Sequence, residues 1–367
     1  MLFSIVMLLF IFIVGLVTGS FLNVVILRTV SGESIVFPGS KCPKCQTPLK
    51  WYHNIPVLSF IFLRGKCGFC HEKISWQYPL VELLTGIIFI LLFLKFCNPF
   101  DILFGLDVVN PITYFQLVNY IFGLVFACLF IVIAGTDIKE MQVSDAHTYS
   151  LIGAGVIYSI VMAAWNLIVY KNEVGMPELD FKFIMTCPVF YSIGAAVICF
   201  VFVEGLRRIS SFLLKVETFG EGDAYIAAGI GAVFGALLGN SALYSSSFLN
   251  ILYVLFAIFV LSAILPIFFI FPIYMKKLYT QKNWFMFCGV IAFIIYAAAY
   301  MYAKNLGWLE NNIALYSSTI VLALLGLLLC KELVMGIKNH TSDGIPCPYG
   351  PALVGAAMIA LLFLKIF

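Results

Sequence analysis

Charged residues are scarce in this chain of 367 residues. Asp, Glu, Lys and Arg together make up 11% of it, against about 25% in soluble domains. Hydrophobic residues make up 63% and the mean hydropathy is +1.06. This balance excludes an ordinary water-soluble domain and predicts a protein that crosses a membrane several times. The formal net charge of +3 gives no indication of a nucleic-acid-binding surface.

Several common catalytic patterns are also absent. The sequence has no G-x-S-x-G turn for a serine nucleophile, no cysteine paired with a suitable base and no phosphate-binding glycine loop. These absences disfavour serine hydrolases, cysteine hydrolases and phosphate-loop enzymes. Residues 1–27 lack the basic start and the A-x-A cleavage site of a signal peptide, so this segment is expected to be the first transmembrane helix.

Long apolar runs are what the sequence has instead. A membrane-spanning helix needs roughly 20 mostly apolar residues. Ten candidate runs cover about 2–27, 80–97, 115–135, 149–170, 183–205, 224–239, 249–272, 284–303, 312–330 and 350–366. The predicted fold class is therefore all-α, a polytopic transmembrane helical protein with about ten spans. The run at 224–239 is short and rich in Gly and Ala, which favours close helix packing.

Basic residues fall mainly in alternate loops of this arrangement. The loops at 28–79, 136–148, 206–223, 273–283 and 331–349 hold 16 of the 21 Lys and Arg. By the positive-inside rule these loops face the cytoplasm and both termini lie outside. Three parts are expected: the first transmembrane helix at 1–27, a small loop domain at 28–79, and a transmembrane domain at 80–367.

The loop domain contains two C-x2-C turns. Cys42, Cys45, Cys67 and Cys70 have a spacing close to that of a four-thiolate zinc site. Disulfides or free thiols are the alternatives, although a cytoplasmic loop disfavours stable disulfides. Structural zinc is expected, because four thiolates leave no open position for catalysis. The other seven cysteines are scattered and are interpreted as small apolar residues of the packing.

Two aspartates stand at the edges of apolar runs. Asp137 ends the third predicted span, and Asp223 opens the sixth behind Gly220-Glu221-Gly222. The predicted topology puts both at the same cytoplasmic depth. If they approach each other, the two carboxyl groups share a proton and titrate as a unit, which suits peptide hydrolysis by an activated water. Helix capping or a solvated membrane edge remains the alternative for each.

Other polar residues compete with this pair. Asp145, Glu140 and Glu221 lie in the same loops, and Asp145 also suits a helix N-cap. Glu82 and Glu204 lie in or near apolar runs, where they need partners; a role in helix packing is favoured for both. His71 and His147 are interpreted as solvated loop residues, and Arg207, Arg208 and Lys215 as topology determinants or lipid-headgroup contacts.

Taken together, the motifs resemble those of the bacterial type IV prepilin peptidase family, bifunctional leader peptidases and N-methyltransferases among the GxGD-type intramembrane aspartyl proteases. The resemblance covers most of the chain. Its motifs are Gly19-Ser20-Phe21-Leu22-Asn23, the paired C-x2-C loop with Ile55-Pro56-Val57-Leu58-Ser59, Tyr78-Pro79-Leu80-Val81-Glu82, the stretch from Asp137 to Asp145, Gly220-x-Gly222-Asp223, and Pro348-Tyr349-Gly350-Pro351.

The resemblance implies that Asp137 and Asp223 are the catalytic dyad and that Asp145 is not a primary catalyst. It implies prepilin or pseudopilin substrates whose short basic leader is cut on the cytoplasmic side, after glycine and usually before phenylalanine. Glu140 and Glu221 are candidates for contacts to such a leader. N-methylation of the new terminus with S-adenosylmethionine and a prokaryotic plasma (inner) membrane are also implied, whereas no residue for the methyl donor is indicated.

The sequence departs from the family pattern at several positions. Ser144 stands where proline is common, Lys139 where a second acid is common, and Tyr225 where lysine is common. A helix pair near 276–335 exceeds the usual eight spans. Two other functions are weighed against the peptidase: a non-catalytic assembly factor for pili or secretion, and a proton- or cation-coupled transporter. The acids gather at one face without a series of midplane charges, which disfavours the transporter.

Overall fold

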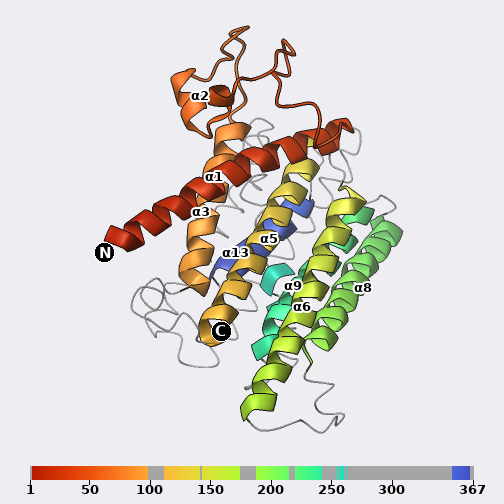
Figure 1. The fold of residues 1–367 in the computed structure, drawn as a ribbon. Coiled ribbons are helices and arrows are strands. Elements are labelled where there is room, and N and C mark those ends of the chain that lie inside the picture. The colour runs from red at the N-terminus through yellow and green to blue at the C-terminus, as the bar shows by residue number, and fades with distance from the viewer. Residues whose placement is uncertain are drawn as a thin grey trace, which may run out of the picture. The chain divides into compact units, whose positions relative to one another are not determined.

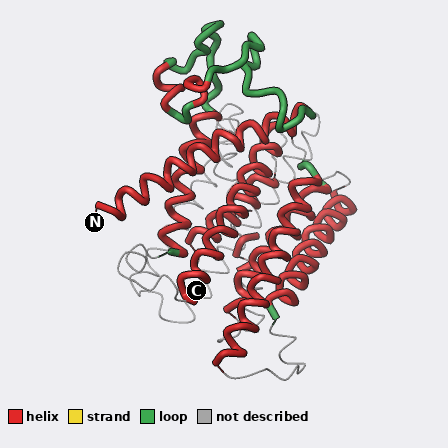
Figure 2. The backbone as a smooth tube through the Cα atoms, viewed as in Figure 1, coloured by secondary structure: helices red, strands yellow, loops and turns green. Residues whose placement is uncertain are grey.

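The structure is a computed structural model that describes residues 2–97, 111–140, 143–173, 187–214, 220–241 and 349–363, with six further positions between 254 and 262 (Figure 1). In these residues every regular element is helical, and no strand is drawn (Figure 2). The all-α prediction is therefore confirmed for this part of the chain. The predicted spans at 284–303 and 312–330, most of the one at 249–272, and the extra helix pair near 276–335 lie outside the described residues.

Among the described residues, six helices are long and apolar enough to cross a membrane. They are α1 (Leu2–Ser31), α3 (Gln77–Phe96), α5 (Pro111–Glu140), α6 (Asp145–Glu173), α8 (Pro188–Leu214) and α9 (Glu221–Ser241). They coincide with the first six predicted spans, so these are confirmed as helices, while the total of ten stays a prediction. A shorter apolar helix, α13 (Tyr349–Phe363), falls within the last predicted span.

The first helix exposes most of its apolar surface. Only 17% of the most apolar stretch of α1 is buried. Large side chains such as Phe10 (66% exposed) and Leu9 (56% exposed) point away from the protein. Exposed apolar side chains in such number are unfavourable in water but suit contact with lipid tails. This distribution agrees with the membrane placement that the composition predicts.

Helix α9, in contrast to α1, is almost completely buried, since 89% of its most apolar stretch lies inside the protein. It packs against α6, α8 and α13. Its small residues make this possible: a Cβ on Gly155 of α6 would lie 2.9 Å from Ala232, and a Cβ on Gly239 would lie 2.8 Å from the Tyr191 Cβ of α8. The Ser192 hydroxyl also donates to the Ala232 carbonyl at 2.9 Å. The Gly- and Ala-rich span is thus a buried helix, as its composition indicated.

Helices α1 and α3 also approach closely through glycine. A Cβ on Gly15 would lie 2.7 Å from the Gly86 Cα, and a Cβ on Gly19 would lie 3.0 Å from the Thr85 Cβ. Across the same contact the Asn23 side-chain amide donates to the Tyr78 carbonyl at 3.1 Å. These contacts fix the start of α3 against α1, and the segment that connects the two helices contains all four cysteines of the C-x2-C turns.

The connecting segment begins at a defined helix end. Gly32 has a φ of +67°, and the Glu33 N–H donates to the Arg28 carbonyl at 3.0 Å, which closes the last turn of α1. The Arg28 guanidinium then donates to the carbonyls of Ser34 (2.8 Å) and Ile35 (3.0 Å), and also to those of Pro38 and Gly39. Further along are the 3-10 helix η1 (Trp51–Asn54) and the short helix α2 (Leu58–Phe62).

Candidate active site and metal centre

Asp137 lies in the last turn of α5 and is only 4% exposed. The preceding Thr136 is also buried, but its hydroxyl is satisfied by the carbonyls of Val132 and Ile133, both at 3.0 Å. With 30 residues, α5 is about 45 Å long, more than a hydrocarbon core of about 30 Å requires. Its last turn can therefore reach the membrane edge, yet the carboxyl group is packed inside the protein, where a charge needs a partner.

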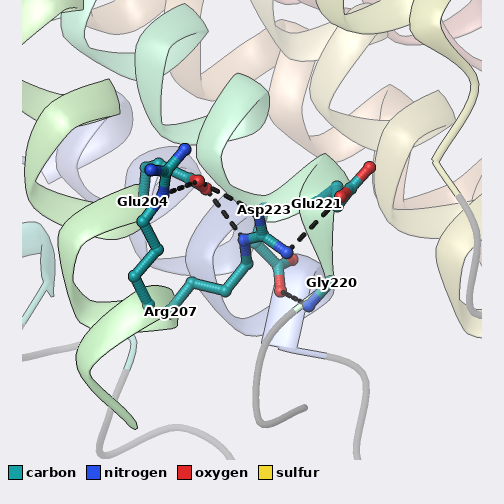
Figure 3. A network of polar contacts seen from close by, with 6 residues as sticks. Glu204, Arg207, Gly220, Glu221 and Asp223 are labelled. Atoms are coloured by element: carbon teal, nitrogen blue, oxygen red, sulfur yellow. Dashed lines mark hydrogen bonds and ion pairs between the residues drawn. The ribbon is translucent and has the colours of Figure 1, made fainter. Parts of the chain in front are cut away.

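Asp223 lies in the first turn of α9 and is 7% exposed. Its Oδ2 accepts a hydrogen bond from the Gly220 backbone N–H at 3.1 Å, as Figure 3 shows. The carboxyl groups of Asp223 and Asp137 are close enough to interact electrostatically. The structure thus brings together the two aspartates that the sequence singled out, one from the end of α5 and one from the beginning of α9.

Two glycines allow the backbone to pass close to this pair. A Cβ on Gly222 would lie 3.2 Å from the Val143 Cβ, just before α6 begins. A Cβ on Gly350, in the first turn of α13, would meet the Asp137 Oδ2 and would lie 3.0 Å from Ile226. The sequence indicated Gly350 only as part of a closing turn, because the contact joins residues more than two hundred positions apart.

An ion-pair network holds the entry of α9 to the end of α8. Arg207 donates to both carboxylate oxygens of Glu204, at 2.8 Å and 2.9 Å, and Arg208 donates to the same carboxylate at 2.7 Å. The Arg207 Nη1 also lies 3.4 Å from Glu221, two residues before Asp223 (Figure 3). Glu204 was predicted to have a role in helix packing, but these ion pairs lie within α8 itself. Arg207, predicted to set topology, also contacts the first turn of α9, which carries Asp223.

The competing acidic residues of the same loops are exposed, unlike the buried aspartate pair. Asp145 is the first residue of α6 and its side chain is exposed, which agrees with the helix-start alternative. Glu140 is exposed at the end of α5, and Glu221 is 82% exposed despite its contact with Arg207. Tyr225, where the family often has lysine, packs its ring against Tyr149 at 5.8 Å between centroids. An aromatic packing contact thus replaces a cation beside Asp223.

The four cysteines of the loop domain form one cluster. Their sulfur atoms all lie within 4.8 Å of one another, and the Cys42 and Cys70 sulfurs are 3.9 Å apart. A tetrahedron with zinc–sulfur distances of about 2.3 Å has edges of about 3.8 Å. The cluster can therefore hold a metal ion, and its four soft thiolate ligands with tetrahedral spacing fit zinc.

The two C-x2-C turns share one backbone pattern. The Gln46 N–H donates to the Cys42 carbonyl at 2.9 Å, and the His71 N–H donates to the Cys67 carbonyl at 3.0 Å. Gln46 and His71 also have left-handed φ values, +57° and +59°. Each turn thus closes on its first cysteine in the same way, so the two turns present their thiols as equivalent halves of one centre.

Hydrogen bonds favour the thiolate form of two of the four thiols. The pKa of the Cys70 thiol is instead raised to about 12, because the bond from the Glu72 backbone is outweighed by burial and by the other three thiols. Hydrogen bonds from Thr47 lower the pKa of the Cys45 thiol to about 6. The backbone N–H groups of Cys70 and Phe69 lower the pKa of the Cys67 thiol. A metal requires the thiolate form, so these donors reduce the cost of deprotonation. Cys97 and Cys199 are buried among apolar helices and lie outside the cluster, as the sequence predicted for the remaining cysteines.

Geometry thus defines a class of protein: helical membrane proteins with two interacting, buried carboxyl groups at the ends of two apolar helices. Here they are joined to a four-cysteine cluster that can hold a metal ion. Two family models match the chain. The bacterial peptidase A24 N-terminal domain matches residues 13–96, and the type IV leader peptidase family matches residues 124–267. The chain belongs to the type IV leader peptidase family.

Three similar curated proteins carry the name prepilin leader peptidase/N-methyltransferase. The protein of Myxococcus xanthus is 40% identical over 150 residues, which cover 40% of this chain and 44% of that protein. The protein of Klebsiella pneumoniae is 33% identical, over 41% of this chain and 61% of the relative. The protein of Neisseria gonorrhoeae is 30% identical over 250 residues, 56% of this chain and 81% of the relative. No solved structure matches the chain significantly.

Proposed function

We propose that this chain is a membrane aspartyl endopeptidase that removes the leader of type IV prepilins or pseudopilins and then N-methylates the new terminus. The observation that carries the proposal is the pair of buried, interacting carboxyl groups, Asp137 and Asp223, in the family's two motifs. The matched family and the printed names of the relatives supply the substrate class and the second activity.

The proposed mechanism needs only these two side chains. One carboxylate accepts a proton from a water molecule, whose oxygen then bonds to the scissile carbonyl carbon. The other carboxyl group, protonated, donates its proton to the carbonyl oxygen. Collapse of the tetrahedral intermediate breaks the C–N bond and returns one hydroxyl proton to the second carboxylate, and the proton taken from water passes to the leaving amine. Because the pair exchanges a proton, neither residue can be replaced without stopping the cycle.

The proposed orientation follows from the charge distribution. Basic residues concentrate in alternate loops, so the aspartate pair and the cysteine cluster are proposed to face the cytoplasm of a prokaryotic inner membrane, with both termini outside. A prepilin has a charged leader followed by an apolar helix. A site at the cytoplasmic edge reaches their junction without moving charge through lipid. The domain limits 1–27, 28–79 and 80–367, structural zinc and about ten spans belong to the same proposal.

Cleavage of a prepilin-like peptide by the purified chain tests this proposal. The peptide carries a basic leader, a Gly-Phe junction and an apolar segment, and mass spectrometry identifies the products in detergent or liposomes. We expect one cut after the glycine and, with S-adenosylmethionine, one methyl group on the new terminus. A folded chain that cuts nothing would favour the non-catalytic assembly factor, whereas ion flux through liposomes without cleavage would favour the transporter.

Replacing Gly350 by alanine is expected to lower the cleavage rate by about 10²-fold with little effect on folding. The added methyl group would displace the Asp137 carboxyl group, and a displacement of about 1 Å can cost this much. Initial rates of peptide cleavage measure the effect. Gly205→Ala is the matched control, because no atom lies within 4 Å of a Cβ there. Equal rates for the two variants would show that the α13 contact does not position Asp137.

A further inference from the structure

A cavity of about 570 Å³ lies between the cysteine segment and the adjoining ends of α1 and α3. Its wall comes from the last turns of α1, the cysteine turns and the first turns of α3. Its volume falls within the range of about 300–1,000 Å³ that is usual for small-molecule sites. The peptidase mechanism uses none of this space, so the cavity needs a separate explanation.

A buried carboxyl group forms part of the wall. Glu82 is 7% exposed, and one of its oxygens accepts the Val57 backbone N–H at 2.7 Å. The Ser20 side chain also interacts with this carboxyl group. A carboxylate has about four acceptor positions, so capacity remains for a ligand. Such a group, held rigidly in a cavity wall, suits a cationic or hydroxyl-bearing ligand.

Aromatic and basic side chains complete the lining. Tyr78 and Phe60 contribute aromatic rings to the lining, and aromatic rings suit a planar heterocycle. Tyr78 is fixed through its backbone carbonyl, which accepts the bond from Asn23. Lys73 and Lys139 bring positive charge that suits a ligand carboxylate. The cavity therefore offers partners for a cation, a planar ring and an anion together.

We propose that this cavity binds the methyl donor S-adenosylmethionine, with Glu82 facing its cationic end and the aromatic residues holding its adenine. This inference rests on the proposed methyltransferase function and assigns residues to it. The donor combines a sulfonium, an ammonium group, a carboxylate, a purine and a ribose diol. The lining offers partners for the cationic groups, the purine and the carboxylate, and this arrangement needs no glycine-rich loop.

The place of the cavity suits the order of the two reactions. Lys139 lines it and lies two residues beyond Asp137 at the end of α5. The amine freed by cleavage is therefore formed near the donor. After the ammonium loses one proton to water, the nitrogen lone pair forms the N–C bond to the methyl group. The C–S bond breaks, its electron pair stays on sulfur as a neutral thioether, and nitrogen takes the positive charge.

Equilibrium binding of radiolabelled S-adenosylmethionine to the purified full chain, without any peptide, tests the site directly. We expect saturable binding to the native chain and a Kd at least about tenfold higher for Glu82→Gln. The glutamine side chain still offers an oxygen to the Val57 N–H, so the fold of the cysteine segment is expected to be kept. The metal content of the variant checks that this fold is intact. Ultraviolet crosslinking of the bound donor is expected to label peptides that contain the cavity lining.

A pair of tyrosine variants separates the cavity from the rest of the segment. Tyr78→Leu removes a ring from the lining and is expected to weaken donor binding about tenfold or more. Tyr52→Leu removes a ring from the same segment outside the lining and is expected to leave binding unchanged. Cleavage of the prepilin-like peptide is expected to persist in Glu82→Gln and in both tyrosine variants, because the aspartate pair is untouched.

The outcomes distinguish the donor-binding cavity from the methyltransferase function on which it rests. Native donor binding in Glu82→Gln and Tyr78→Leu, or a crosslink outside the lining, would overturn the cavity while leaving the methyltransferase standing. A native chain that cleaves but neither binds the donor nor methylates a peptide already cut would overturn both the cavity and the methyltransferase. A native chain that binds the donor but does not cleave would leave the cavity standing and remove the peptidase.

Discussion

Asp137→Asn and Asp223→Asn are each expected to lower the rate of prepilin cleavage by at least about 10³-fold. General acid–base catalysis contributes roughly 10²–10⁴-fold, and residues that act as a unit lose most of their effect when either is changed. Asparagine keeps the shape and the hydrogen-bond acceptor toward Gly220 but cannot exchange a proton. Initial rates with the native chain and both variants, at equal amounts of folded protein, measure the loss.

Asp145→Asn is the matched control for these variants. It makes the same change in the same region of the chain, but Asp145 is exposed at the start of α6. Asparagine is also a good helix-start residue, so cleavage is expected to stay near the native rate. Unchanged cleavage in Asp137→Asn or Asp223→Asn would refute the aspartyl mechanism, and loss only in Asp145→Asn would move the catalytic role to that residue.

Cys67→Ser is expected to remove the bound metal and unfold the cysteine segment while the spanning helices stay intact. Between residues 32 and 76, Cys42 and Cys67 are the only buried side chains, so the segment has almost no core besides the metal centre. Structural zinc sites contribute about 10–16 kcal/mol in small domains. Metal analysis is expected to show one ion per native chain and almost none in the variant, and limited proteolysis to cut the segment much faster.

Cys128→Ser is the matched control, because Cys128 lies on α5 away from the cluster. It is expected to keep the metal and the protease resistance of the segment. A Cys67→Ser variant that keeps its metal would contradict the four-thiolate centre. A native chain that holds no metal, and whose segment resists proteases only until a reductant is added, would establish disulfides in its place.

The sequence predicted those features that depend on local composition. Apolar runs located the six described spans within several residues, and the Gly and Ala content of the sixth marked it as a buried helix. The repeated C-x2-C spacing located the metal cluster, because each turn sets two thiols by itself. The edges of the apolar runs singled out Asp137 and Asp223, although several other acids competed with them.

Features that join distant segments could not be predicted in the same way. Gly350 approaches Asp137 only because α13 packs against α5. Arg207 of α8 lies 3.4 Å from Glu221 of α9, and no local sequence pattern predicts this contact between two helices. Glu82 was expected to have a role in helix packing, but its bond to Val57 also makes it part of a cavity wall. Such contacts depend on the tertiary fold, which a single sequence without an alignment does not specify.

The close packing of α9 determines the direction in which the Asp223 carboxyl group points, and this group is proposed to be catalytic. A Cβ on Gly229 would lie 2.6 Å from the Leu151 Cδ2, and the Ala232 carbonyl accepts a hydrogen bond from the Ser192 hydroxyl. The rotation of α9 about its own axis is therefore set two to three turns away from Asp223. One residue inserted between Asp223 and Gly229 would turn that carboxyl group by about 100°. The direction of the Asp223 carboxyl group toward Asp137 thus depends on helix contacts two to three turns away, so substitutions there are expected to abolish the proposed activity without changing either aspartate.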